Sequence, residues 1–216
     1  MTRMVLVRHG ETVWHAENRY AGRTNVALTE TGRAQAMQLA GWSREQKFDA
    51  VWSSPLSRAR QTAQPSADAL ALPLQIEERL IELDFGDAEG LTASEMRQRF
   101  PSERKAFELD PAANPLPGGE SPNAAAMRGV DALRAMASRS PEGRVLVVAH
   151  STLLRLILCR LMGVSLSQYR ILFPHFDNCA ITEIGLAPAG ATALLTYNAP
   201  LPPFVNLLGE YSDRDA

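Results

Sequence analysis

The chain has 216 residues, of which 45% are hydrophobic and 21% charged, with a formal net charge of −2. This composition is typical of a globular protein, and the charge excludes a general attraction to nucleic acid or acidic membranes. No signal pattern stands at the amino terminus, and the strongest apolar stretch, "LLRLILCRLMGV", is too short to cross a bilayer. We therefore expect a cytoplasmic protein that forms one domain over residues 1–216, with Cys159 and Cys179 as buried thiols.

The amino-terminal part of the chain alternates predicted strands with predicted helices. A continuous apolar run predicts a buried strand over residues 4–8. A helix is expected over residues 30–45, with Thr29 or Thr31 as its N-cap. The segment "FDAVWSS", residues 48–54, predicts the next strand.

The second helix is expected over residues 54–72, directly after that strand. Ser54 is the predicted N-cap, and Pro55 is placed at the first helical position, where its missing N–H costs little. Pro65 is expected to kink or interrupt this helix, because proline removes a hydrogen bond from a helix interior.

Residues 86–121 break the pattern, because glycines and prolines punctuate short helical pieces at 92–100 and 102–109. This segment predicts a small helical insertion over one end of the sheet, and so over the active site. It ends at "PLPGGES", where we favour a turn with Ser121 as the N-cap of a long helix over residues 122–138.

The carboxyl-terminal part resumes the alternation. Residues 144–149 predict a third buried strand, followed by an apolar helix over about 152–162. Residues 179–186 and 191–198 predict a strand hairpin. The order of elements indicates an α/β fold, a three-layer sandwich with a mostly parallel central sheet flanked by helices.

Two histidines stand just past predicted strands. His9 and His150 each follow a strand by one residue and lie at or just before an expected helix start, while Arg58 lies in the first turn of another helix. Ligands bind at the carboxyl ends of strands in such sheets. If the strands are neighbours, these residues and Arg8 form a cationic site beside helix N-termini with free N–H groups, which suits a phosphoryl group. A bound anion would also offset the unfavourable position of Arg58 at the positive end of its helix.

Four segments, in this order, carry a resemblance to a known family: "LVRHGET", "SSPLSRARQTA", "ELDFGDAEG" and "VVAHS". They resemble the histidine phosphatase superfamily, in the branch that also contains the cofactor-dependent phosphoglycerate mutases. The resemblance runs from residue 4 to about residue 185. An RHG triplet alone is a weak signal, whereas four ordered motifs at strand ends and loops are a strong one.

The resemblance implies a role for each residue. His9 is the expected nucleophile, which forms a phosphohistidine. Arg8, Arg58 and a cationic His150 are expected to stabilise the phosphoryl oxygens, so that neither a metal nor another cofactor is needed. Glu82 matches the general acid, which would then activate water in the second step.

Simpler interpretations stand beside these roles. A single histidine at a strand end is usually structural. Glu82 shares its segment with other acidic residues that are expected to be solvated, namely Glu77, Glu78, Asp84, Asp87 and Glu89. The four histidines of the chain fit no common metal-ligand spacing, so no metal site is predicted.

Two positions depart from the family pattern. His15 stands where the family usually has an asparagine that holds the phosphoryl group, and Ser151 stands where glycine is common. The segment "RYAGRTN" resembles the loop that lays backbone N–H groups against substrate, with Ala21 and Gly22 at the contact positions. The expected substrate contacts are therefore Arg8, His15, Ala21, Gly22, Arg58, His150 and Ser151.

Three functions remain open at this point. A phosphomonoester hydrolase is favoured over a mutase, because mutases carry a longer and more basic insertion. The basic residues of the corresponding region here are Arg97, Arg99, Arg104 and Lys105. The third possible function is a non-catalytic module that binds a phosphorylated ligand. It is disfavoured because every matched catalytic position holds the residue type of the family. The expected partner is a small phosphorylated metabolite, with no nucleic acid or membrane, and a homodimer is left open. Pocket walls are expected from the insertion, "FPHFDN" with His175, and "YNAPLPPF", which do not select one substrate.

Overall fold

The computed structural model describes residues 1–187 and 190–202, and their strands form one six-stranded sheet in the order β3-β2-β4-β1-β5-β6. The strands are β1 (Thr2–Arg8), β2 (Ala50–Ser53), β3 (Leu74–Ile76), β4 (Arg144–Ala149), β5 (Ile181–Leu186) and β6 (Thr192–Ala199). The first four are mutually parallel, and β5 runs antiparallel to both of its neighbours, β1 and β6. The predicted mostly parallel sheet and the hairpin that closes it are confirmed.

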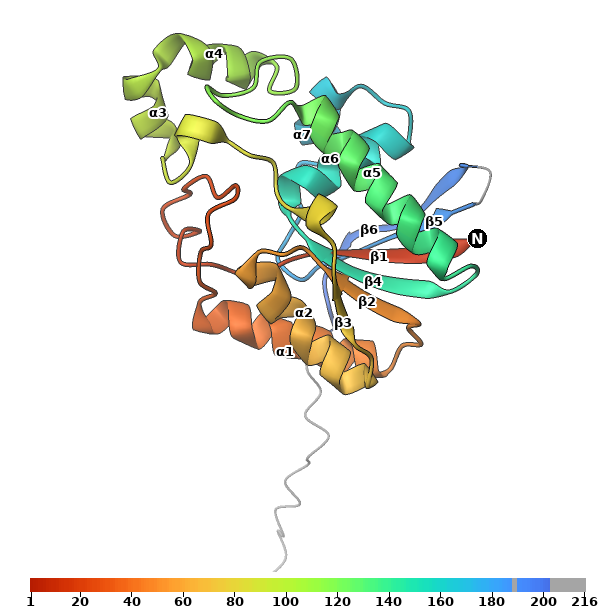
Figure 1. Ribbon diagram of the computed structural model, residues 1–216. Coiled ribbons are helices and arrows are strands. Elements are labelled where there is room, and N and C mark those ends of the chain that lie inside the picture. The colour runs from red at the N-terminus through yellow and green to blue at the C-terminus, as the bar shows by residue number, and fades with distance from the viewer. Residues whose placement is uncertain (188–189, 203–216) are drawn as a thin grey trace, which may run out of the picture.

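Helices cover both faces of this sheet (Figure 1). The α-helices are α1 (Glu30–Arg44), α2 (Ser57–Leu70), α3 (Ala93–Arg99), α4 (Pro101–Leu109), α5 (Pro122–Arg139), α6 (Ser151–Leu161) and α7 (Tyr169–Leu172). Single 3₁₀ turns are η1 (Glu78–Leu80), η2 (Gly86–Ala88) and η3 (Leu166–Gln168). Helices α1 and α2 lie on one face and α5 and α6 on the other, which confirms the three-layer α/β architecture. No helix within the described ranges is both long and apolar enough to cross a membrane.

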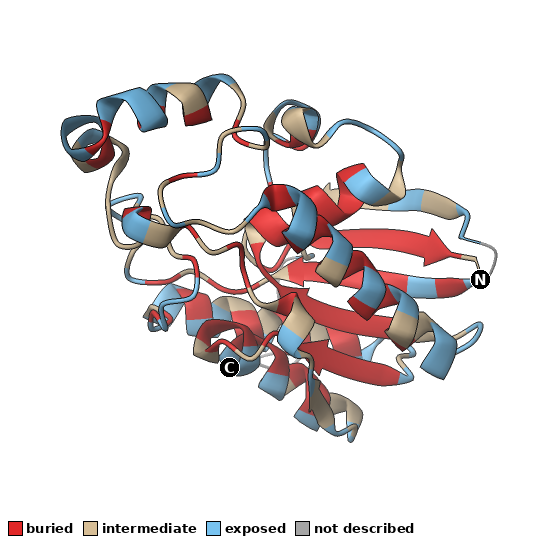
Figure 2. Cartoon of the chain, turned by 45° about the horizontal axis from the view of Figure 1, so that its top comes forward, coloured by how far each residue is buried: buried red, intermediate tan, exposed pale blue. Residues whose placement is uncertain are grey.

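The central strands are buried on both faces, as Figure 2 shows. Side chains alternate along a strand, so Val5 and Val7 of β1 pack towards α1 and α2, whereas Met4 and Leu6 pack towards α5 and α6. This two-sided burial explains why β1 and β4 are continuous apolar runs in the sequence. Cys159 and Cys179 are buried free thiols, as expected.

The start of α2 differs from the prediction. The helix begins at Ser57 with Leu56 as its N-cap, so Ser54 is not the cap and Pro55 precedes the helix. The reason is that Ser54 continues the strand pairing, since its N–H donates to the Val148 carbonyl at 3.0 Å. Pro65 lies inside α2 without interrupting it, because a row of fully buried alanines holds the helix on the sheet on either side of the proline.

The segment after β1 also differs from the prediction. No helix follows His9 directly, and residues 10–28 form a loop that leads to α1, which Thr29 caps through its side chain. The expected helical pieces of the insertion are present as α3 and α4, and Ser121 caps α5 with Pro122 at its first turn, as predicted. The sequence interpretation missed β3 and α7, which are too short for a periodic pattern to reveal.

Candidate active site

The two strand-end histidines meet because β1 and β4 are paired in parallel with Arg8 opposite Ala149. Each strand therefore ends one residue before a histidine at the same edge of the sheet. The ring centroids of His9 and His150 are 5.2 Å apart, and both side chains are buried. The sequence predicted that His9 and His150 meet if their strands are neighbours, and the structure confirms both points.

His9 is oriented by contacts at both ring nitrogens. Its Nδ1 lies 2.7 Å from the Gly10 carbonyl oxygen, which can only accept, so Nδ1 carries the proton. Nε2 then keeps its lone pair and accepts from Arg58 Nε at 3.1 Å. Burial and then the charges of Arg58 and Arg8 hold the pKa of His9 well below its ordinary value. The imidazole is therefore neutral at pH 7, as a nitrogen nucleophile must be.

The positive charge beside His9 is held by backbone carbonyls. Arg58, completely buried in the first turn of α2, donates to the carbonyls of Thr24 at 2.7 Å and Gly22 at 2.7 Å. Arg8 donates to the Phe176 carbonyl at 2.9 Å. Burial lowers the pKa of each arginine to about 10, so both stay charged at neutral pH. No carboxylate of the described chain forms an ion pair with either arginine, and this charge is left for a ligand.

The loop predicted to present N–H groups to substrate presents carbonyls to Arg58 instead. The Ala21 carbonyl accepts from Arg58 at 3.2 Å, and Ala21 also lines the site cavity, as expected. Gly22 is buried away from that cavity, where a Cβ would lie 2.2 Å from Glu89 Oε1. Glu89 and Arg58 occupy the two sides of Gly22, and the expected substrate contact at this residue stays a prediction.

Burial and nearby positive charge disfavour the protonation of His150 in the free protein, and the cationic form expected during phosphoryl transfer stays a prediction. Burial, followed by the charge of Arg58, holds the pKa of His150 well below its ordinary value. Its Nε2 lies 2.7 Å from Ser54 Oγ, and its Nδ1 is buried with no protein partner among the described residues. If the Ser54 hydroxyl donates to Nε2, Nδ1 bears a proton that a phosphoryl oxygen could accept. Ser54 is the residue that contacts Nε2, a neighbour that sequence reasoning missed.

Glu82 occupies the backbone donors that were expected to bind phosphate. Its carboxylate accepts from the N–H groups of Thr152 at 3.0 Å and Leu153 at 2.8 Å, at the start of α6. It also accepts from its neighbour Leu83 at 2.8 Å. Burial raises the pKa of Glu82, and these three N–H groups oppose the rise. The side chain is therefore a buried carboxyl whose proton affinity is increased, next to His150, at the place where a general acid is needed.

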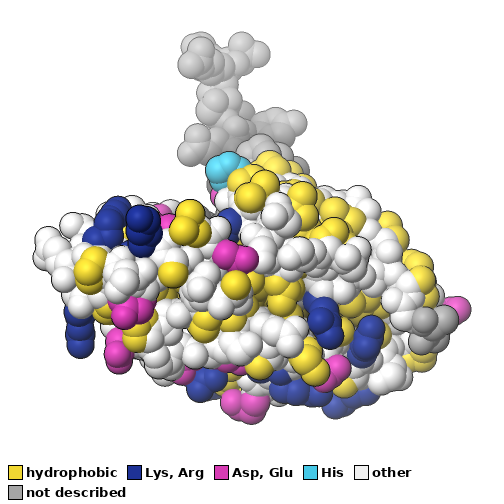
Figure 3. Space-filling view, turned by 90° about the horizontal axis from the view of Figure 1, so that it is seen from above, with side chains coloured by type: hydrophobic (Ala, Val, Ile, Leu, Met, Phe, Trp, Pro, Cys, Tyr) yellow, Lys and Arg dark blue, Asp and Glu magenta, His cyan; other side chains and the backbone are white. Residues whose placement is uncertain are grey.

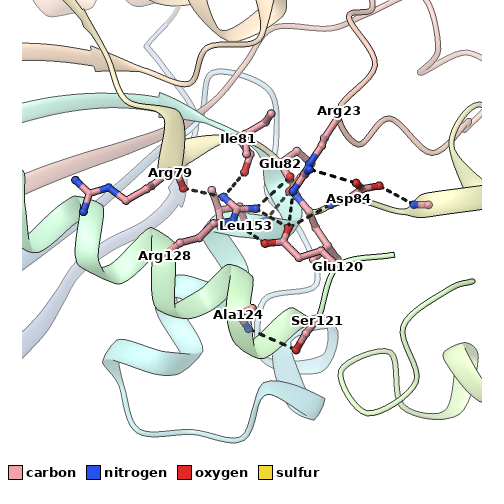
Figure 4. Close-up of polar contacts among 12 residues, drawn as sticks. Arg23, Arg79, Ile81, Glu82, Asp84, Glu120, Ser121, Ala124, Arg128 and Leu153 are labelled. Carbon is pink, nitrogen blue, oxygen red and sulfur yellow. Dashed lines mark hydrogen bonds and ion pairs between the residues drawn. The ribbon is translucent and has the colours of Figure 1, made fainter. Parts of the chain in front are cut away.

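A partly buried arginine on α5 holds the Glu82 segment in place (Figure 4). Arg128 donates to the carbonyls of Arg79 at 2.7 Å and Ile81 at 2.6 Å, and to that of Glu82 at 3.2 Å. Glu120, the acidic residue of the "GGES" turn, binds Arg128 through both oxygens at 2.8 Å. The turn thus does more than start α5, since it anchors the arginine that positions Glu82.

A cavity of about 350 Å³ opens in front of these groups. Arg8, His9, His15, Ala21, Glu82 and Ser151 line it among the predicted residues. His15 accepts from Arg8 Nη2 at 2.6 Å through Nε2, and burial lowers its pKa. Sequence reasoning missed the other residues of the wall, which include Trp14, Tyr20, Phe85, Arg155 and Arg170. No single residue among these carries a motif, so tertiary structure alone identifies them.

The outer walls differ from the expectation. His175 is exposed and does not line the cavity, whereas the carbonyl of the next residue, Phe176, binds Arg8. Part of the expected tail wall, from Pro203 onwards, lies outside the described residues. Within the described ranges, no three histidine, cysteine, aspartate or glutamate side chains gather in a group able to hold a metal ion.

The family model of the histidine phosphatase superfamily (branch 1) matches residues 4–199. The chain belongs to this superfamily. The histidine phosphatase described here is 33% identical over 169 residues to phosphoserine phosphatase 1 of Hydrogenobacter thermophilus, a match that covers 78% of this chain and 80% of that protein. It is also 34% identical to a protein of Erwinia tasmaniensis named as a probable phosphoglycerate mutase, over 85% of each chain.

Further similarities agree with this assignment. A bifunctional protein of Mycobacterium tuberculosis is 41% identical over 91% of this chain, which spans only 54% of that longer protein. The solved structure of a mycobacterial glucosyl-3-phosphoglycerate phosphatase superposes with a TM-score of 0.83 at 26% identity, covering 92% of this chain and 99% of the other. The histidine phosphatase is accordingly an enzyme of the phosphatase type.

Acidification is expected to destabilise this histidine phosphatase through its buried histidines. His9 and His150 have depressed pKa values when folded and ordinary ones when unfolded, so protons bind preferentially to the unfolded chain as pH falls below about 6.5. As pH falls from 7.5 to 5.5, we expect each of these two histidines to lower the free energy of unfolding by about 1 kcal/mol. Urea unfolding of His150→Gln should show a correspondingly smaller pH dependence. The exposed His175→Gln is the control, and an unchanged pH dependence in His150→Gln would contradict the assignment.

Loosening the Glu82 segment is expected to impair turnover. Arg128→Lys keeps the charge on α5 but cannot reach three carbonyls and both Glu120 oxygens with one ammonium group. We expect kcat to fall about tenfold for alkyl phosphates and less for p-nitrophenyl phosphate, since only the former need the acid. The exposed Arg134→Lys on the same helix should match wild type. An equal loss on both substrates would show that Arg128 does not act through Glu82.

Proposed function

We propose that this chain is a metal-independent phosphomonoester hydrolase that works through a phosphohistidine intermediate on a small phosphorylated metabolite. The observation that carries the proposal is the unprotonated Nε2 of neutral His9 at a cavity wall, where it accepts from Arg58 and lies beside Arg8 and His150. The guanidinium groups of the buried Arg58 and the partly buried Arg8 have no carboxylate partners in the described chain, and they match a dianionic phosphoryl group in charge and in hydrogen-bonding geometry.

The first step transfers the phosphoryl group to His9. Nε2 attacks phosphorus, and the bond between phosphorus and the ester oxygen breaks. Arg8, Arg58 and the Nδ1–H of His150 stabilise the equatorial oxygens, while Glu82 gives its proton to the leaving alkoxide. Arg58 donates to Nε2 in the free enzyme and turns to a phosphoryl oxygen as the substrate binds, which frees the Nε2 lone pair for the attack. His15 holds Arg8 from behind in place of the family asparagine.

The second step returns the enzyme to its resting state. Glu82, now ionised, takes a proton from water, and the resulting hydroxide oxygen displaces Nε2 from phosphorus. Inorganic phosphate leaves, and His9 is again neutral. The positive groups that served the first step serve the second, because the equatorial oxygens keep their positions during an in-line displacement.

A phosphoglycerate mutase-type isomerase is the second candidate, favoured by the sequence relative named for that activity. A mutase must hold its substrate in two orientations and exclude water. The basic residues of the insertion do not serve that purpose in the structure. Arg104 is buried against Tyr20 and Glu108, Arg97 pairs with Glu108, and neither lines the cavity. The hydrolase is therefore preferred, with a cytoplasmic location, no nucleic-acid or membrane partner, and a homodimer left open.

Removal of the nucleophile tests the proposal directly. His9→Ala should lower hydrolysis of a phosphomonoester panel by at least about 10⁴-fold, because the variant lacks the side chain that attacks phosphorus in the proposed mechanism. When the reaction is quenched, the wild-type enzyme should carry an acid-labile, base-stable phosphoryl group that His9→Ala lacks. All assays contain EDTA. His175→Ala is the matched control. Near-normal hydrolysis by folded His9→Ala, or activity that EDTA removes and a divalent ion restores, would overturn the mechanism, and phosphoglycerate interconversion without net hydrolysis would favour the mutase.

The general acid is expected to govern the alkaline side of the pH profile. Burial raises the pKa of Glu82, and its protonated form declines as pH rises through that value, so kcat for alkyl phosphates should fall towards higher pH. Glu82→Gln should lose about 10²- to 10³-fold on alkyl phosphates, less on p-nitrophenyl phosphate, and should lose the alkaline limb. Asp84→Asn, a half-exposed neighbour, is the control. Leaving-group dependence in Asp84→Asn but not in Glu82→Gln would reassign the acid.

A further inference from the structure

The cavity carries more positive charge than a single phosphoryl group requires. Four arginines line it, namely Arg8, Arg19, Arg155 and Arg170, in addition to the completely buried Arg58 behind His9. Arg19 is neutralised by Glu17 at 2.7 Å and Glu95 at 2.9 Å. Arg8 and Arg58 belong to the phosphoryl site. Arg155 and Arg170 remain without an assigned role.

Arg155 lies on the cavity side of α6, one turn after Ser151, which lines the same cavity. Its Nη2 donates to the Pro174 carbonyl at 3.0 Å, and its Nε is buried with no partner among the described residues. Burial lowers the pKa of Arg155, as expected for a cation that lacks a compensating carboxylate. Arg155 and Arg8 line the same cavity, and the charge of Arg155, second to burial, lowers the pKa of Arg8.

Arg170 is held by neutral groups on α7 and its neighbours. Its Nε donates to the Tyr169 hydroxyl at 2.9 Å, and its Nη2 lies 3.5 Å from the Tyr20 hydroxyl. The guanidinium stands 4.8 Å from the ring centroid of Phe107 on α4. Phenols and an aromatic face orient this cation without neutralising it. Neither Arg155 nor Arg170 forms an ion pair with a carboxylate within residues 1–187 and 190–202.

This arrangement differs from that of basic residues on the surface. On the face seen in Figure 3, lysine and arginine side chains are interspersed with acidic and apolar ones. Among the described residues that line the cavity, by contrast, Glu82 is the single carboxylate, and its oxygens accept from the start of α6. Two partly desolvated like charges that repel each other are costly unless a ligand supplies an anion. Since Arg155 adjoins Arg8, one small molecule can reach both positions.

We propose that Arg155 and Arg170 form a second anion subsite, which selects phosphomonoesters that bear a further anionic group, a carboxylate or a second phosphate. The proposal rests on the proposed function, because the subsite is defined relative to a phosphoryl group held at His9. The bidentate geometry of a guanidinium fits the oxygens of either group. Arg19, already paired, contributes shape to this end of the cavity and no free charge.

Matched substrates test the subsite. 3-Phosphoglycerate and glycerol 3-phosphate differ by a carboxylate, as do phosphoserine and phosphoethanolamine, while fructose 1,6-bisphosphate and fructose 6-phosphate differ by a phosphate. We expect wild type to prefer the more anionic member of at least one pair by about tenfold or more in kcat/KM. The carboxylate pairs and the phosphate pair distinguish the two sources of the anion. Hydrolysis of p-nitrophenyl phosphate, which has no second anion, measures the phosphoryl site separately.

The variants Arg155→Gln and Arg170→Gln should each reduce that preference about tenfold, mainly through KM, and the preference should weaken in high salt. Arg160→Gln, an exposed position on the same helix, is the control and should keep the wild-type preference. The subsite is overturned if the wild-type ratio of kcat/KM values is near one in all three pairs, or if the preference survives both substitutions. In either case, continued hydrolysis of p-nitrophenyl phosphate upholds the proposed function. Absence of all phosphatase activity in folded wild type overturns the proposed function itself.

Discussion

The parallel pairing of β1 with β4 is the constraint on which the rest of the site depends. Arg8 lies opposite Ala149, so the residues that follow, His9 and His150, emerge side by side from the same edge of the sheet. A shift of this register by one residue would turn every side chain of one strand to the opposite face. The fully buried, two-sided packing of both strands prevents such a shift. The geometry of the reactive centre is therefore a consequence of the hydrophobic core.

The electrostatics of the site follow from burying cations without carboxylates. Carbonyl oxygens of residues 21, 22, 24 and 176 orient Arg58 and Arg8 while leaving their net charge in place. The same charge, together with burial, keeps both histidines neutral. An ion pair in place of these carbonyls would have lowered the affinity for an anion and raised the proton affinity of the histidines. Backbone ligation of arginine thus serves both nucleophilicity and phosphate binding.

Glu82 links the two halves of this arrangement. It accepts from the first N–H groups of α6, the helix that begins directly after His150, and Arg128 holds its backbone from the opposite side. The helix start is thus used to place a carboxyl group. Under the proposed mechanism, side-chain cations hold the phosphoryl group and Glu82 protonates the leaving oxygen. Arg155, one turn along the same helix, extends the charged wall outwards from this centre.

The sequence by itself determined the architecture and the reactive groups, because both leave local signals. Buried parallel strands are uninterrupted apolar runs, and His9, Arg58, Glu82 and His150 stand in ordered motifs at strand ends and loops. Only the tertiary structure decided the state and surroundings of these groups. The neutrality of His150, the occupation of the α6 N–H groups by Glu82, the hydroxyl of Ser54 at the ring, and the grouping of Arg155 with Arg170 all arise between segments distant in the chain. Desolvation and charge proximity are properties of three-dimensional packing, and no residue pattern along the chain encodes them separately.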